Sequence, residues 1–101
     1  METNKQISVL MDCLDLLVAV SFLKSDRQRK ELIQQIIASL EGYPKRENMP
    51  NGLAAYLYVS MACNTAKLAH IGYIPFEKSF RLISNCLEMA LSLLTDKGQP
   101  Q

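Results

Sequence analysis

The sequence predicts an all-α fold, a single-domain antiparallel four-helix bundle, and three observations support this. Apolar residues recur every three or four positions over four long segments, which is the spacing of one helix face. No segment has the sustained alternation of a half-buried strand. The chain has 101 residues, enough for one domain with one core. Short connections place successive helices antiparallel. A tetratricopeptide-like pair of helical hairpins, which buries the same faces, is the alternative.

The first helix is expected over residues 5–23. Two apolar rows run along it, one through Leu10 and one through Cys13. Between them lies only a narrow polar stripe that includes Asp12 and Asp15. A helix that is apolar on most sides is covered on most sides. We therefore expect it to be central in the bundle or to dock a partner.

The second helix is expected over residues 26–41. Ser25 and Gln28 have the spacing of a capping box, in which side chains satisfy free N–H groups of the first turn. Gly42 follows the last apolar residue and is expected to stop the helix in a left-handed conformation. The face expected to point inward consists of Leu32, Ile33, Ile36, Ile37 and Leu40. The loop 42–51 contains two prolines and several charges and is expected to be an exposed connector.

The third helix is expected over residues 52–71, and Lys67 is its only permanent charge. A seam of small residues runs along it, which would let a neighbouring helix approach closely. The seam consists of Ala55, Ala62, Ala66 and Ala69. Bulk on an adjacent face comes from Leu57, Met61 and Leu68.

The fourth helix is expected over residues 75–94. Gly72 ends the preceding helix and Pro75 begins the next, which is the usual order of these two residues at helix boundaries. The connection is therefore expected to be tight and antiparallel. The tail 95–101 contains Gly98 and Pro100 and is expected to be frayed.

Composition argues against several classes of function. The 11 Lys and Arg residues nearly balance the 10 Asp and Glu residues, whereas nucleic-acid binders carry clustered positive charge. The three cysteines are far apart, which predicts free thiols, a reducing compartment and a cytoplasmic location. Asp12 and Asp15 interrupt the most apolar N-terminal stretch, so no membrane span is expected.

No catalytic residue, metal ligand or cofactor site is predicted. The single histidine, His70, has no partner evident in the sequence that would orient it for acid–base work, and a role at the end of the third helix is favoured. Asp12 and Asp15 are better explained as a solvated stripe than as a metal site. The sequence contains no glycine-rich phosphate loop and no zinc-binding spacing. We therefore expect a protein that is not an enzyme.

The excess apolar surface of the first and third helices points to a protein partner, with a homodimer as another possibility. The partner could be a helical client or a membrane-receptor complex. Tyrosines and cations near the second helical hairpin are the candidate contact residues. They are Tyr56, Tyr58, Lys67, His70, Tyr73, Lys78 and Arg81.

The second half of the chain resembles the enterocin-A-type bacteriocin immunity proteins. The resemblance rests on Leu53-Ala54-Ala55-Tyr56-Leu57-Tyr58 and on Lys67-Leu68-Ala69-His70-Ile71-Gly72-Tyr73-Ile74-Pro75, followed by an amphipathic helix. It implies a small cytoplasmic helical bundle that protects a producing cell by blocking a receptor-bound bacteriocin. It also implies that the third and fourth helices and the C-terminal end determine specificity.

Two other functions remain open from the sequence. The first is a helical chaperone or adaptor of a bacterial secretion system, in which the first and third helices form a groove for a client helix. The second is a small DNA-binding regulator that uses Arg27, Arg29 and Lys30 at the start of the second helix. The balanced charge of the chain argues against the regulator.

Overall fold

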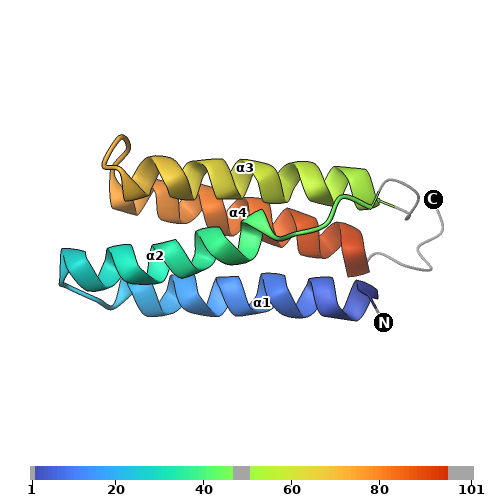
Figure 1. The fold of residues 1–101 in the computed structure, drawn as a ribbon, viewed down its shortest axis with the longest axis horizontal. Coiled ribbons are helices and arrows are strands. Elements are labelled where there is room, and N and C mark those ends of the chain that lie inside the picture. Colours follow the sequence, from blue (N-terminus) through green and yellow to red (C-terminus); the bar gives the residue numbers. More distant parts are fainter. Residues whose placement is uncertain (1, 47–50, 96–101) are drawn as a thin grey trace.

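The computed structural model describes residues 2–46 and 51–95, and this part of the chain forms four α-helices with no strand (Figure 1). The helices are α1 (Glu2–Ser21), α2 (Asp26–Glu41), α3 (Gly52–His70) and α4 (Phe76–Thr95). The predicted all-α fold is confirmed. The bounds of α2 agree with the prediction. The first helix begins three residues and ends two residues earlier than expected, α3 ends one residue earlier, and α4 begins and ends one residue later. Residues 96–101 lie outside the described part, so the expectation of a frayed tail stays a prediction for them.

The helices form a closed ring of neighbours. Each packs on the next along the chain, and α1 also packs on α4. Within the described residues, the backbones of α1 and α3 do not approach each other closely, and neither do those of α2 and α4. At one end, the Arg29 side chain of α2 still reaches the Phe76 ring of α4. The directions of the helices alternate from α1 to α4 (Figure 1). This is the ring of an up-down-up-down bundle, because the tetratricopeptide-like alternative would leave α1 and α4 apart.

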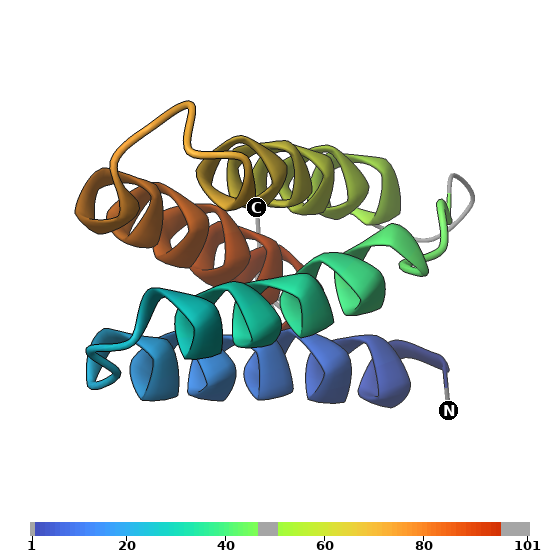
Figure 2. The same ribbon diagram turned by 60° about the vertical axis from the view of Figure 1, so that its left-hand side comes forward.

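The bundle is elongated, with extents of 45 × 22 × 21 Å. The α1–α2 and α3–α4 connections lie together at one end of the long axis (Figures 1 and 2). The start of α1 and the end of α4 lie at the other end. Residues 22–25 and 71–75 therefore lie at the same end of the bundle.

The core follows the predicted periodicity on α2 and α4. Ile33, Ile36, Ile37 and Leu40 of α2 are buried, and so are Ile83, Leu87, Ala90 and Leu94 of α4. On both helices, bulky aliphatic side chains point inward. Removing this area from water supplies the main favourable term in folding.

The first helix does not have the central position that its composition predicted. Its buried row consists of Leu10, Cys13, Leu17 and Val20, whereas Met11 and Val18 are more than half exposed. The expected central position is therefore wrong, whereas the alternative that a partner covers this helix stays a prediction. The reason is the ring arrangement, which gives each helix only two neighbours and leaves the outer side of α1 open.

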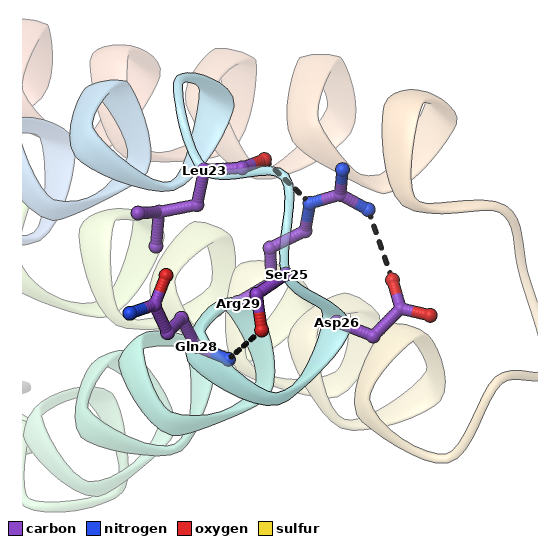
Figure 3. Close-up of polar contacts among 5 residues, drawn as sticks. All are labelled: Leu23, Ser25, Asp26, Gln28 and Arg29. Atoms are coloured by element: carbon purple, nitrogen blue, oxygen red, sulfur yellow. Dashed lines mark hydrogen bonds and ion pairs between the residues drawn. The ribbon is translucent and has the colours of Figure 1, made fainter.

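The α1–α2 connection is held by polar contacts around the first turn of α2 (Figure 3). The Ser25 hydroxyl accepts a hydrogen bond from the Gln28 backbone N–H at 3.4 Å, as the predicted N-cap requires. Arg29 donates from Nε to the Leu23 carbonyl at 2.9 Å and forms an ion pair with Asp26 at 3.1 Å. These contacts fix where α1 ends and α2 begins.

The two glycines that follow helices behave differently. Gly72 follows α3 as expected, and its φ of 81° places it in the left-handed region that favours glycine. Gly42 has a φ of −84°, so the expected left-handed stop after α2 is wrong. Tyr43 next to it is buried and belongs to the core, which corrects the expectation that the connector is exposed from its first residue. Residues 47–50 of that connector lie outside the described part.

Candidate functional site

The third helix has its small residues inside and its large apolar residues outside. All four seam alanines are buried, as are Val59 and Cys63. The opposite side carries a row that we call the α3 ridge, made of Leu53, Leu57, Met61 and Leu68. These four side chains are between 38% and 53% exposed. Their spacing of four, four and seven residues keeps them on one side of the helix.

The sequence analysis predicted three of the four members of the α3 ridge but not their outward orientation. The residues predicted to add bulk beside the alanine seam are Leu57, Met61 and Leu68, and Leu53 joins them in the structure. The structure places the seam against α4 and α2 and leaves the bulk without a covering element. The signal was available in the seam itself, because small residues allow close helix approach only when they face the neighbour. The apolar face opposite them then points away from the bundle.

The two tyrosines of α3 that were predicted as contact residues are partly used in packing. Tyr56 and Tyr58 are half-buried, and both pack against the core cluster. The Lys45 ammonium lies 5.8 Å from the centre of the Tyr56 ring, within the range of a cation–π contact. Both rings lie beside the α3 ridge and are not part of it.

Lys67 is engaged within the molecule. Its ammonium lies 2.7 Å from a Glu41 carboxylate oxygen, and this hydrogen bond raises the pKa of Lys67. The contact ties the end of α2 to α3. His70 is half-buried in the last turn of α3, where a positive charge would complement the helix dipole. Neither residue lies on the α3 ridge.

The remaining candidates lie towards the end that carries the two helix connections. Tyr73 is 77% exposed in the α3–α4 turn, and its N–H donates to the Leu68 carbonyl at 2.8 Å. Lys78 and Arg81 are exposed on the first two turns of α4. The seven predicted residues therefore do not converge on one site. They divide between the flank of α3 and this end of the bundle.

The described residues offer little reactive chemistry. Burial raises the pKa of Cys13 to about 11 and raises the pKa of Cys63 and Cys86, so all three free thiols stay protonated at neutral pH. Within residues 2–46 and 51–95, no three His, Cys, Asp or Glu side chains are grouped to hold a metal ion. No helix in this part is long and apolar enough to cross a bilayer.

One cleft of about 270 Å³ lies between the start of α1 and the end of α2. The Gln6 side chain lines it, is almost fully buried and has no hydrogen-bond partner in the structure. None of the predicted site residues and none of the α3 ridge residues line this cleft. Other hollows are lined by predicted residues, one by His70 and another by Lys78 and Arg81. The α3 ridge lines none of these hollows, so it is a surface and not a pocket.

Comparisons with protein-family models, with curated proteins and with solved structures found no match to this chain.

Proposed function

We propose that this protein is a non-enzymatic interaction module that docks a partner protein on the α3 ridge. The observation that carries the proposal is the arrangement of side chains on α3. Its small alanines face the core, and its large leucines and methionine face outward. Core packing does not explain the outer residues, because they cover no neighbouring helix. An apolar row that the fold leaves open is typical of a contact site.

The size of the α3 ridge supports this role. Its four side chains expose about as much surface as two fully accessible large residues, on the order of 400 Å². A standard interface buries about 800 Å² on each partner, with an apolar centre and a polar rim. The ridge would supply that centre. The rim would come from the half-buried Tyr56 and Tyr58 and from Asn64, which is exposed between Met61 and Leu68.

The shape of the ridge defines the kind of partner. It is a single helix face rather than a groove, so the partner would supply an apolar groove or a helix pair that accepts α3. The chaperone alternative requires a groove between the first and third helices. In the described residues, α1 and α3 lie diagonally across the bundle, and their backbones do not approach each other closely. The geometry therefore favours a docking helix over a client-binding groove.

The resemblance to bacteriocin immunity proteins gives the proposal a specific form. In that form the partner is a receptor-bound bacteriocin, the setting is the cytoplasm, and the α3–α4 hairpin carries recognition. The exposed Tyr73 in the turn of this hairpin supports it. The test is expression of the chain in sensitive bacteria challenged with a panel of bacteriocins. We expect increased tolerance to one of them. Unchanged killing by all of them would contradict the proposal of bacteriocin immunity.

The regulator alternative has less support from the geometry. Arg29 is only 26% exposed, and its guanidinium is engaged with Leu23 and Asp26. Arg27 lies 3.6 Å from Glu31. Two of the three cations proposed for DNA contact are therefore used within the protein.

The general proposal is tested by site-specific photocrosslinking in the native cell. A photoreactive residue at Leu57 should give one discrete adduct, and the same residue at Gln35, which is exposed on α2, should not. The captured protein should then bind the purified chain at least tenfold more weakly when Leu57→Gln and Met61→Gln are combined. Equal adducts from both positions, or an unchanged affinity, would contradict the proposal. An adduct of twice the chain's mass would assign the ridge to a homodimer instead.

A further inference from the structure

The three most exposed large apolar side chains of the described residues gather at one end of the bundle. Phe22 is 79% exposed, Tyr73 is 77% exposed and Ile71 is 71% exposed. Phe22 lies in the α1–α2 connection and the other two lie in the α3–α4 connection. Both connections are at the same end of the long axis (Figures 1 and 2). We call this surface, residues 22–31 and 68–82, the tip.

The two connections are fixed relative to each other by contacts across the tip. The Arg29 guanidinium lies 5.3 Å from the centre of the Phe76 ring and so joins the start of α2 to the start of α4. The same guanidinium holds the Leu23 carbonyl and the Asp26 carboxylate (Figure 3). The left-handed Gly72 turns the chain between Ile71 and Tyr73. The apolar side chains are therefore presented by an ordered surface.

The tip is the basic end of a nearly neutral molecule. It contains six Lys and Arg residues and three Asp and Glu residues, which gives a net charge of +3. The whole chain has a net charge of +1, so the rest of the sequence has a net charge of −2. Two of the tip cations, Arg27 and Arg29, form ion pairs with tip carboxylates. The four exposed cations without an ion pair are Lys24, Lys30, Lys78 and Arg81.

We propose that the tip docks on the surface of an anionic lipid bilayer, a role that goes beyond the proposed protein contact on the α3 ridge. Phe22, Ile71 and Tyr73 would enter the interface between headgroups and acyl chains, where apolar area leaves water and a tyrosine hydroxyl keeps polar contacts. The unpaired cations would lie against anionic headgroups, which attract basic residues near a membrane surface. The bundle would then stand with its long axis directed away from the bilayer.

The composition of the tip favours a bilayer over other acidic partners. Three of the four unpaired cations are lysines, which protein interfaces disfavour, whereas anionic lipids attract Lys and Arg alike. Nucleic acids bind largely through phosphate contacts, and such contacts do not explain the exposed Phe22 and Ile71 at the same end of the bundle.

The test is co-sedimentation with vesicles of phosphatidylcholine alone and of phosphatidylcholine mixed equally with phosphatidylglycerol. At low salt the chain should bind only the anionic vesicles, and 1 M salt, with a Debye length of about 3 Å, should release most of it. Combined Lys24→Gln, Lys30→Gln and Lys78→Gln should reduce partitioning by about a hundredfold, because each cation contributes roughly fivefold. Combined Phe22→Ser and Tyr73→Ser should reduce it at least about tenfold.

Matched controls separate the tip from the rest of the surface. Met11→Ser removes an apolar side chain of α1 that is 54% exposed and lies outside the tip, and Lys5→Gln removes a cation at the other end. Both variants should bind as the parent chain does. Because the chain has no tryptophan, Phe22→Trp provides a local reporter. Its emission should shift to the blue on anionic vesicles, and that of Met11→Trp should not.

Three results would overturn the proposal. The first is no binding to anionic vesicles at low salt. The second is equal, salt-independent binding to both kinds of vesicle. The third is undiminished vesicle binding by the Phe22→Ser and Tyr73→Ser variant together with equally tight binding to duplex DNA, which would define a general polyanion site. The Leu57→Gln and Met61→Gln variant should retain vesicle binding, so failure of the ridge proposal can be distinguished from failure of this one.

Discussion

The α2 and α3 helices are neighbours in the same bundle but use their apolar residues in opposite ways. On α2, four Ile and Leu residues are buried, and polar residues such as Gln34 and Gln35 are exposed. On α3, the buried residues are mainly alanines, and the large apolar residues are exposed. The difference teaches that apolar content alone does not say which residues make a core.

The two helices also contribute differently to the spacing of the bundle. Small buried residues let α3 lie close to α4, and this pair has the most extensive contact in the bundle. The bulky face of α2 fills volume between helices instead. Stability should therefore depend on bulk in α2 and on the lack of bulk on the inner side of α3.

The largest effect is expected from a cavity on α2. Ile36 is fully buried, so Ile36→Ala should lower the free energy of unfolding by about 2–5 kcal/mol. Leu57→Ala removes a similar volume from the α3 ridge and should cost less than about 1 kcal/mol, because the side chain is 53% exposed. Urea denaturation of both variants measures this comparison. Equal losses would mean that the ridge is part of the core.

A second effect is expected from adding bulk to the seam of α3. Ala62 is fully buried, so Ala62→Leu should force α3 away from its neighbours and cost about 1–3 kcal/mol. Met61→Leu, one residue earlier on the exposed side, should change stability by less than about 0.5 kcal/mol. Thermal unfolding by circular dichroism measures both. A neutral Ala62→Leu substitution would show that the seam is not closely packed.

A smaller effect is expected at the start of α2. Arg29→Met keeps much of the side-chain stem but removes the donor to the Leu23 carbonyl and the contact with the Phe76 ring, and should cost about 1–2 kcal/mol. Arg27→Met is the matched control, because the Arg27 side chain is 89% exposed. It should change stability by less than about 0.5 kcal/mol. If the two variants are equally stable, Arg29 does not join the two helix connections.

The burial of the Cys13 thiol predicts that the stability of the protein depends on pH above neutrality. Burial raises the pKa of Cys13 from its ordinary value of 9.0 to about 11, so the folded protein holds this proton more tightly than the unfolded chain. Stability should therefore be unaffected by this thiol below pH 9 and should fall as the pH rises from about 9 to 11. Denaturation at several pH values should show a shallower fall for Cys13→Ala. Parallel profiles for the two proteins would mean that the thiol is not desolvated.

Much of the fold could be predicted because its signals are local. Ser25 and Gln28 mark the start of α2, and the structure confirms the bounds of that helix. Gly72 marks the end of α3 through a left-handed turn that glycine adopts at little cost. The alternation of short connections and long helices then leaves few arrangements, and the bundle is the simplest of them.

The candidate site could be predicted only in part, because it depends on which elements lie next to each other. Tyr73 was predicted and is exposed, since it follows a tight glycine turn. Lys67 was predicted as a contact residue, and its ion pair with Glu41, which is 26 residues earlier in the chain, could not be predicted from the sequence. The outward orientation of the α3 ridge was missed because α3 has few charged residues to mark its outer side, and only the alanine seam indicates which side faces the bundle. Phe22 was missed because single exposed aromatics become a group only in the folded bundle.

The central claim is that the outer face of α3 is not part of the core, and one measurement tests it directly. The variant combining Leu57→Gln, Met61→Gln and Leu68→Gln keeps residues with good helix propensity and removes most of the α3 ridge. Its free energy of unfolding in urea should lie within about 1 kcal/mol of the parent value, because exposed substitutions have small effects. A loss of several kcal/mol, comparable with that of Ile36→Ala, would contradict the claim.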